Sequence, residues 1–534
     1  MSIACLLALA LGACTVHGAH EGSSAGTLTI ALRKEPTSLN PLALEGTDSY
    51  TFGPLIYSYL TQYTPDGRSV GDLAAAAPTP ENGGVTDGGR RLVFHLRRNV
   101  RWQDGAAVTA RDVLFTYRAI MNPANNVDTT YGYDRVVTIA APDAYTVVIT
   151  LKKAFSPIVG DFFGGDTNYP ILPAHLLASF SNLNSVPFNA APVGSGPYAL
   201  QAWERGDRLR LRANARYYAG TPATPELDLP FVPDDSTRIQ ELQTGEVDAA
   251  FLLDASRIAQ LRAISGHRVV VTPVPYFYAL AYNVRRPIFA DAAVRKAISL
   301  SIDSRTLTRK VSSGVYDADT AMRGLFTWAY DPAVKQLEFN PAAAGALLDR
   351  DGWKRGSDGI RVKNGRRLEM QLIFPSGQEI TTRLATAIAA AVRATGIDMS
   401  MRAYQRQQFI ARDGPELTGN FDVSLYDYQG TFDPDASWLL ACDQSAPHGF
   451  NLSGYCDATM DKLLEEAAAS FDRNVRIADY RAIQRRLMEA LPYFLICQIS
   501  EVDVIPGDLR GFAPPLLSPF SSVASWRRSG GSSR

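Results

Sequence analysis

The stretch that most constrains this chain is a strand that runs directly into a helix. Residues 276–282 alternate aromatic and small or apolar side chains, which predicts a strand that ends at Asn283. Pro287 has no N–H to donate and interrupts the ladder. Asp291 is then placed to cap a helix, because its carboxylate can accept the free N–H groups of the first turn, and apolar residues follow at helical spacing over 294–302. The stretch therefore predicts an α/β fold.

The length of the chain predicts more than one lobe. A chain of 534 residues exceeds what a single hydrophobic core usually organises. Strands at 368–374 and 397–402 flank a helix at 379–393, and helices of this length between strands predict parallel pairing. The formal net charge of -1 argues against a polyanion-binding surface, so we expect no nucleic-acid partner.

The N-terminus predicts export. Residues 3–11 form an apolar run that is too short to span a bilayer and is typical of a signal-peptide core. The run ends in Leu11-Gly12-Ala13-Cys14, which resembles a bacterial lipobox and predicts a signal peptide over 1–13, a lipid on Cys14 and a flexible tether over 14–26. A plain secretory cleavage site with an incidental cysteine is the alternative. No Lys or Arg precedes the run, which leaves the true start of the chain open.

Four ordered motifs occur along the chain, each at one place. They are E-P-x-x-L-x-P at 35–41, W-x-D-G-x-x-x-T-A-x-D-V at 102–113, V-G-S-G-P-Y at 193–198, and N-x3-P-x-F-x-D-x2-V-R-x-A-I-x3-I-D from Asn283 onward. With them the chain resembles the oligopeptide-, dipeptide- and nickel-type (family 5) solute-binding proteins of bacterial ABC importers, over nearly its whole mature length. The resemblance implies a two-lobed periplasmic-binding-protein-like fold (type II, cluster C) with an extra small lobe inserted in the first lobe.

The resemblance also implies domain boundaries and a role. The expected first lobe comprises 27–65, 193–275 and 500–527, the small lobe 66–192, the second lobe 276–499, and a disordered tail 528–534. The implied protein is no enzyme and needs no cofactor. It would be a monomeric lipoprotein, periplasmic or on the cell surface, that captures a peptide or similar small solute in the interlobe cleft. It would deliver that solute to a membrane permease that works with a cytoplasmic ATPase.

Two of the cysteines allow a disulfide. Cys442 and Cys456 bracket a polar loop, and a bridge there would close a short loop in an oxidising compartment. Family members often carry a disulfide near this place, although two free thiols are the alternative. Cys497 lies in an apolar run at 493–499 and is predicted to be a core residue.

The ligand site is predicted after a strand at 421–425. This strand would deliver the next three side chains to its C-terminal end, where ligands gather in open α/β lobes. The resemblance implies an aromatic wall there, although lobe core explains the aromatic candidates equally well, and Arg285 and Arg286 are better explained as a solvated pair than as carboxylate ligands. The candidate ligand-binding residues are Tyr278, Asn283, Tyr426, Asp427, Tyr428, Gly430, Thr431, Asp433 and Trp438.

One position weakens a peptide as the ligand. Peptide-binding relatives place an aspartate about four residues before the proline of this loop, where it pairs with the ligand's ammonium group. Here Gly430 holds that spacing, or Thr431 if one residue is deleted, and neither can neutralise an ammonium. Asp427 would be a displaced carboxylate, whereas Asp433 and Asp435 are better explained as caps of the loop. A sugar-containing oligomer, a metal chelate or an opine-like compound are the other candidate ligands.

Two other functional classes stay open. An exported hydrolase would need a nucleophile, but the residue two before Ser195 is Val193, so the G-x-S-x-G pattern fails, and the six histidines form no HExxH motif. A ligand-sensing lipoprotein without transport would use the same fold.

Overall fold

The computed structural model describes residues 26–529 except 44–46, 65, 128, 162, 166–168 and 515–517. The predicted signal peptide, Cys14 and all of the tether but its last residue therefore lie outside the described residues, as do residues 530–534. Within the described ranges no helix has both the length and the apolar character needed to cross a membrane.

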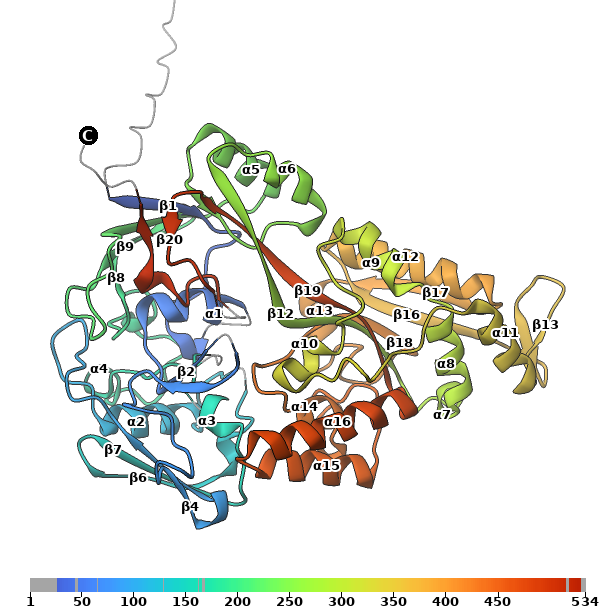
Figure 1. Ribbon diagram of the computed structural model, residues 1–534, viewed down its shortest axis with the longest axis horizontal. Coiled ribbons are helices and arrows are strands. Elements are labelled where there is room, and N and C mark those ends of the chain that lie inside the picture. Colours follow the sequence, from blue (N-terminus) through green and yellow to red (C-terminus); the bar gives the residue numbers. More distant parts are fainter. Residues whose placement is uncertain are drawn as a thin grey trace, which may run out of the picture.

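A ten-stranded sheet runs through the whole molecule in the order β17-β16-β18-β12-β19-β11-β1-β10-β9-β8. We call the part built on β1 and β8–β11 the first lobe and the part built on β16–β18 the second lobe; they lie left and right in Figure 1. The strands are β1 (Thr27–Ala31), β8 (Tyr198–Glu204), β9 (Arg208–Ala213), β10 (Glu226–Pro230), β11 (Ala249–Ala250), β12 (His267–Tyr282), β16 (Glu369–Pro375), β17 (Asp398–Tyr404), β18 (Val423–Gln429) and β19 (Tyr493–Pro506).

Two long antiparallel strands, β12 and β19, connect the lobes (Figure 1). Residues 267–273 of β12 pair with 500–506 of β19, and the register then shifts between Pro273 and Phe277. Prolines lack the N–H that a central ladder needs, so Pro273 and Pro275 favour an interruption at this place. Beyond the shift, β12 pairs with β18 from Tyr276 to Tyr282, which makes it the central strand of the second lobe.

The second lobe is a mixed sheet with helices on both faces. β16 pairs in parallel with β17 and with β18, and α12 (Glu379–Ala394) connects β16 to β17, as the strand–helix–strand pattern predicts. Asp291 caps α8 (Ala292–Leu300) by accepting the Ala293 N–H at 2.8 Å, which confirms the predicted helix start. α12 contributes to the core on one face, whereas α15 (Ala458–Ala469) and α16 (Arg473–Ala490) contribute to the core on the other.

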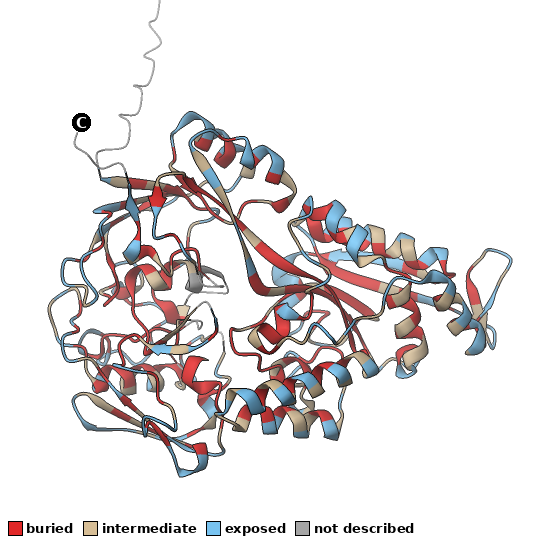
Figure 2. Ribbon diagram, viewed as in Figure 1, coloured by how far each residue is buried: buried red, intermediate tan, exposed pale blue. Residues whose placement is uncertain are grey.

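A small lobe with a sheet of its own packs on the first lobe. Its four strands lie in the order β4-β5-β7-β6, and α2 (Ala110–Ile120) starts with a capping box of Thr109 and Asp112. The buried residues of this lobe belong to the same hydrophobic cluster as those of the first lobe, so the two share a continuous core (Figure 2). The strands are β4 (Val85–Thr86), β5 (Arg91–His95), β6 (Val136–Asp143) and β7 (Thr146–Leu151).

Shorter elements complete the first lobe. α5 (Asp235–Thr244) and α6 (Ile258–Arg262) cover one face of its sheet, and β2 (Thr61–Tyr63) pairs with β3 (Ser69–Gly71) after α1 (Thr47–Ile56). At the C-terminal end, β21 (Arg527–Arg528) pairs with β20 (Leu509–Arg510). Arg528 also forms ion pairs with Asp508 at 2.9 Å and with Asp248 at 3.1 Å. The prediction of a disordered tail from residue 528 is therefore wrong at Arg528, because the strand and these two acids hold it.

Candidate functional site between the lobes

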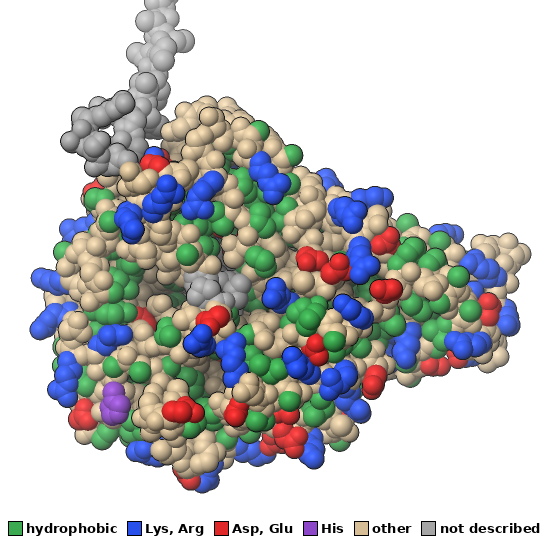
Figure 3. Space-filling model, viewed as in Figure 1, with side chains coloured by type: hydrophobic (Ala, Val, Ile, Leu, Met, Phe, Trp, Pro, Cys, Tyr) green, Lys and Arg blue, Asp and Glu red, His purple; other side chains and the backbone are tan. Residues whose placement is uncertain are grey.

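A pocket lies where the first lobe meets the second. The cavity itself is about 50 Å³, and Figure 3 shows the face of the molecule on which the two lobes meet. Ligand sites are usually clefts lined by apolar and aromatic side chains with a few polar groups. The aromatic residues that line it are Tyr57, Tyr59, Tyr63, Tyr217 and Phe432.

A buried acid holds one side of this pocket in place. Asp72 accepts the backbone N–H of Tyr59 at 2.7 Å and the side-chain amide of Gln62 at 3.1 Å, and it also accepts the Tyr218 hydroxyl. Burial raises the pKa of the Asp72 carboxyl, whereas these hydrogen bonds and the charge of Arg97 lower it. Tyr59 and Gln62 line the pocket, so Asp72 orients its wall without lining it.

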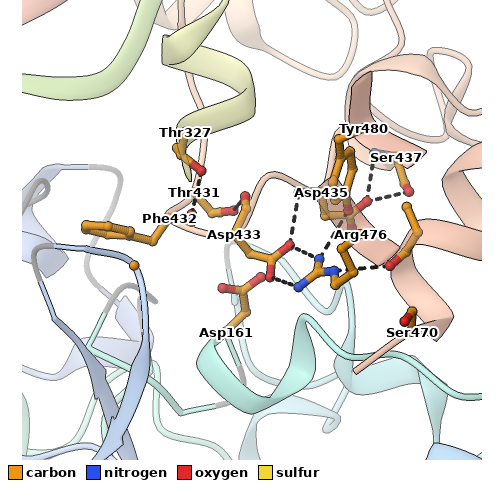
Figure 4. Close-up of polar contacts among 12 residues, drawn as sticks. Asp161, Thr327, Thr431, Phe432, Asp433, Asp435, Ser437, Ser470, Arg476 and Tyr480 are labelled. Carbon is orange, nitrogen blue, oxygen red and sulfur yellow. Dashed lines mark hydrogen bonds and ion pairs between the residues drawn. The ribbon is translucent and has the colours of Figure 1, made fainter. Parts of the chain in front are cut away.

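The second lobe reaches the pocket through the loop after β18. Asp433 is buried and pairs with both terminal nitrogens of the Arg476 guanidinium, at 2.7 and 2.5 Å (Figure 4). Asp435 is also buried and accepts the backbone N–H and the hydroxyl of Ser437, at 3.0 and 2.5 Å. The two hydrogen bonds between Asp433 and the Arg476 guanidinium fix both the position and the orientation of the Asp433 carboxylate. The loop therefore presents Phe432 in a fixed position.

Three of the contacts between the lobes involve Phe432, Asp435 and Arg473. The ring of Phe432 stacks on the ring of Tyr63, with centroids 5.0 Å apart and planes 18° apart. The Tyr131 hydroxyl of the small lobe donates to Asp435 Oδ2 at 2.9 Å. The Arg473 guanidinium of α16 donates to the carbonyl oxygens of residues 66 and 67, at 2.9 Å each. The lobes are thus in direct contact on either side of the aromatic pocket.

The central predicted residues lie inside a strand rather than after one. β18 extends to Gln429, so Tyr426, Asp427 and Tyr428 are part of its ladder with β12. The predicted strand end at residue 425 is wrong, because β12 continues to pair with β18 up to Tyr276. Tyr428 is 4% exposed and its ring stacks on Phe277 at 5.6 Å. It belongs to the core of the second lobe and is no pocket wall.

Four other predicted residues are engaged within the second lobe. Tyr278 is buried and its hydroxyl contacts that of Thr381 at 3.1 Å. Asn283 donates to the carbonyl oxygens of Gly419 and Phe421, at 3.0 and 2.9 Å. Thr431 and Trp438 also contact neighbours within this lobe.

Asp427 lies 3.4 Å from the Arg406 guanidinium, and burial raises the pKa of its carboxyl. Tyr426 packs beside them, with the Arg406 guanidinium 5.2 Å from its ring centre. Thr431 donates to the Asp433 carbonyl oxygen at 2.8 Å, and Trp438 is half-buried beside the core. None of the nine predicted ligand-binding residues lines the aromatic pocket.

Gly430 has no room for a side chain. Its N–H donates to the Pro275 carbonyl oxygen at 2.7 Å. A Cβ at this position would lie 2.9 Å from the Gly324 carbonyl oxygen and 3.0 Å from that of Pro275. Both are backbone atoms, so a carboxylate at residue 430 would require the backbone to move. The missing aspartate therefore follows from close backbone packing.

Sequence reasoning missed the residues that do line the pocket. Phe432 follows the predicted Thr431 directly, and Tyr57, Tyr59 and Tyr63 lie within one short aromatic stretch. These closely spaced aromatic residues were the signal in the sequence for a ligand pocket. Aromatic residues that lie this close together more often belong to a hydrophobic core. Only the arrangement of the lobes brings Phe432 against Tyr63.

The cysteines of the second lobe are accounted for. Cys442 and Cys456 are joined as a disulfide, with their Cα atoms 4.6 Å apart. Together with Asp461 they form the only group of three potential metal-ligating side chains in the described part of the chain. Their sulfurs are bonded to each other and are not available as thiolate ligands. Cys497 is buried as predicted, and burial raises the pKa of its thiol to about 12.

Comparisons with known proteins agree with this architecture. Protein XP55 of Streptomyces lividans is 30% identical over 513 residues, which cover 96% of this chain and 90% of that protein. The structure of NikZ from Campylobacter jejuni in complex with Ni(L-His) has a TM-score of 0.79 at 24% identity and covers 95% of this chain and 100% of that one. The oligopeptide-binding protein AppA from Bacillus subtilis, in complex with a nonapeptide, has a TM-score of 0.78 at 22% identity, with 95% and 100% covered.

These likenesses confirm the predicted two-lobed fold, and the related proteins are binding proteins rather than enzymes. The family model for the bacterial extracellular solute-binding proteins, family 5 Middle, matches residues 70–449. Because that match covers more than half of the chain, and a relative reaches 30% identity along nearly all of it, the chain belongs to family 5 of the bacterial extracellular solute-binding proteins.

Proposed function

We propose that this protein is the substrate-binding component of an ABC importer, which captures a peptide or similarly sized solute between its lobes and delivers it to a membrane permease. The observation that carries the proposal is the aromatic pocket, which takes Tyr57, Tyr59 and Tyr63 from one side and Phe432 from the other. Since only β12 and β19 of the described strands run from one lobe into the other, the lobes can separate and close about them. Closing would bury a ligand, and ligand affinity would select the closed state.

The relatives support a small solute but not one chemical class. The AppA structure holds a nonapeptide and the NikZ structure holds Ni(L-His), so this fold accommodates different ligands. In this chain Gly430 leaves no space for an ammonium-binding aspartate, which argues against a peptide held in that manner. The Leu11–Cys14 motif supports anchoring through a lipid on Cys14, and a monomer is the expected state of the anchored protein.

The test is to identify what the purified protein retains. The full chain, prepared without refolding, is weighed by native and then denaturing mass spectrometry, and any released compound is returned to the empty protein by calorimetry. A retained solute that binds again, unchanged after long incubation, supports the proposal. A compound that is hydrolysed during incubation favours an exported hydrolase. An empty protein that no compound library stabilises contradicts solute binding altogether.

Membrane delivery needs a separate measurement. Globomycin, which blocks lipoprotein signal peptidase, is expected to shift the mass of the exported protein if Cys14 is lipidated, whereas a Cys14→Ala variant is expected to be released from the membrane. A wild-type protein found free of the membrane would contradict the anchor. Solute uptake that does not depend on this protein would favour a sensing role.

A further inference from the structure

β19 carries two acids at the place where it runs from one lobe to the other. Glu501 and Asp503 are two residues apart, so both side chains leave the same face of the strand. Ile505, the next residue at that spacing, packs in the core of the first lobe. Val502 and Val504 leave the opposite face and pack with α5 and α6. The acid pair therefore lies on the face of the hinge that is turned to the first-lobe core.

One oxygen of this pair is buried and unsatisfied. Asp503 is 0% exposed; its Oδ1 accepts the Leu252 N–H at 3.1 Å, whereas its Oδ2 has no hydrogen-bond partner. Glu501 is half-buried, and its side chain forms no hydrogen bond or ion pair within the described ranges, although its backbone pairs with Thr272 of β12. A buried polar atom without a partner is rare in native proteins and costs free energy. Asp503 thus offers a free acceptor beside a second carboxylate.

Within the described ranges no cation pairs with these acids. In the part of the chain that the structure describes, neither Glu501 nor Asp503 is paired with a Lys, Arg or His. Arg268 of β12 lies opposite Ile505 in register, but its guanidinium donates to the Leu509 carbonyl oxygen at 3.3 Å. Burial raises the pKa of Asp503 to about 7, and burial together with the Asp503 charge raises the pKa of Glu501. Two neighbouring carboxylates without a counter-ion resist ionising together.

We propose that Glu501 and Asp503 form a cation subsite at the hinge, which receives a positively charged group of the solute. This inference rests on the proposed solute-binding function and narrows the solute to one that carries a cationic group. An ammonium or a chelated metal ion would supply the charge that no side chain supplies and would satisfy the free Asp503 oxygen. The subsite would take the role that a carboxylate cannot take at Gly430.

The subsite lies on strands that both lobes share. β12 and β19 are paired over residues 267–273 and 500–506, on the first-lobe side of the register shift. A cationic group bound there would stay attached to the first lobe while the second lobe moves. The rest of the solute would then contact the second lobe only after closure.

The test compares a charge-neutral hinge with the wild-type hinge. The full chain and the Glu501→Gln/Asp503→Asn variant are screened by thermal shift, with calorimetry on every hit, against pairs of compounds that differ in charge. The pairs are trialanine with N-acetyl-trialanine and 1,5-diaminopentane with 1,5-pentanediol, and Ni²⁺ with L-histidine is added as a metal arm. The matched control is Glu466→Gln/Glu489→Gln, which removes two exposed acids of the second lobe.

We expect at least one cationic compound to raise the melting temperature of the wild-type and control proteins. Its affinity for the hinge variant should fall on the order of tenfold to a hundredfold, as expected for loss of a charge-assisted contact. A response to the amines alone identifies an ammonium, and a response to Ni²⁺ with L-histidine alone identifies a metal chelate. A panel in which no cationic member stabilises the wild type, or in which the hinge variant binds equally well, overturns the subsite.

The failure of the subsite differs from failure of solute binding. A neutral or anionic compound that is retained by the wild type, and bound equally by the hinge variant, would sink the subsite and leave the proposed function standing. If neither protein retains or binds any compound, both proposals fall. The hinge variant should also melt at a higher temperature than the control variant at pH 8, because the mutual repulsion of the two acids is removed.

Discussion

Two pairs of acids, one in each half of the molecule, are treated in opposite ways. In the loop after β18, Asp433 meets the Arg476 guanidinium and Asp435 accepts hydrogen bonds from Tyr131 and Ser437. On β19, the side chains of Glu501 and Asp503 together accept one hydrogen bond within the described ranges, from the Leu252 N–H to Asp503. The members of each pair are two residues apart; Asp433, Asp435 and Asp503 are buried, and Glu501 is half-buried.

The difference separates structural acids from acids that are available to a ligand. A buried carboxylate that faces a guanidinium has exchanged its hydration for protein contacts, so it has no capacity left for a solute. A buried carboxyl group without a cation can still bind a positively charged group, and its burial lowers the free energy of unfolding. By this criterion the loop acids hold Phe432 in place, whereas the hinge acids stay available. Four substitutions break or sharpen the contrast, beginning with the largest expected effect.

Arg476→Leu removes the cation that pairs with Asp433 in the loop after β18. It leaves Asp433 buried without its partner, and removing one member of a buried ion pair costs about 3–5 kcal/mol. Urea unfolding at pH 7, followed by circular dichroism, measures the loss. The control is Arg383→Leu, whose pair with Glu379 is largely exposed and should cost about 0.5 kcal/mol or less. A loss no larger than that of the control would show that Asp433 does not depend on Arg476.

Glu416 tests a buried acid whose carboxyl group has one hydrogen-bond partner in the described ranges, a hydroxyl. It is 4% exposed, accepts the Ser424 hydroxyl at 2.8 Å, and burial raises its pKa from 4.5 to about 8. The folded state therefore binds this proton more tightly than the unfolded state does. The resulting stability is complete below pH 4.5 and is lost as the pH rises to about 8.

Glu416→Gln should remove this pH dependence. We expect wild-type stability to fall by about 4 kcal/mol more than that of the variant between pH 5 and pH 9, measured by urea unfolding at each pH. Gln retains an acceptor for Ser424, so the hydrogen bond is preserved. Parallel stability curves for the two proteins would contradict a raised pKa at Glu416.

Gly430→Ala tests why the loop has no ammonium-binding aspartate. The added carbon would press on the Gly324 and Pro275 carbonyl oxygens, and overpacking of this kind costs about 1–3 kcal/mol. Gly345→Ala is the control, because its added carbon would meet only a guanidinium nitrogen at 3.3 Å. Thermal unfolding compares the two. A Gly430→Ala protein as stable as the wild type would show that a side chain fits and would restore the peptide interpretation of this loop.

Tyr131→Phe makes Asp435 more like the hinge acids by removing one of its partners. The lost hydrogen bond joins the small lobe to the second lobe, so closure should weaken by about 1 kcal/mol, or about fivefold in ligand affinity. Calorimetry with the retained solute and small-angle X-ray scattering measure affinity and closure. Tyr145→Phe, in the same lobe, removes a hydroxyl without a hydrogen bond in the described ranges and should change neither. Equal affinities for both variants would mean that this contact does not stabilise the closed form.

Sequence by itself determined the elements whose signals are local. The helix start at Asp291 and the helix over Glu379–Ala394 follow from side chains within one or two turns. The family motifs added the two-lobed fold, because each motif is also a short run of neighbouring residues. These predictions hold since capping and periodicity depend on nearby backbone groups, whatever the rest of the chain does.

Tertiary structure decided which candidate residues are available to a ligand. Asp433 and Arg476 are far apart in sequence. The Asp433 carboxylate is paired with a guanidinium because α16 packs beside the loop. Tyr428 likewise lies in the ladder between β12 and β18, which the residues around Tyr428 do not predict. Phe432 stacks on Tyr63 of the other lobe. Glu501 and Asp503 look no different from those loop acids in the sequence, and they differ because no side chain in the described ranges pairs with their carboxyl groups. Availability depends on long-range contacts, which local spacing does not encode.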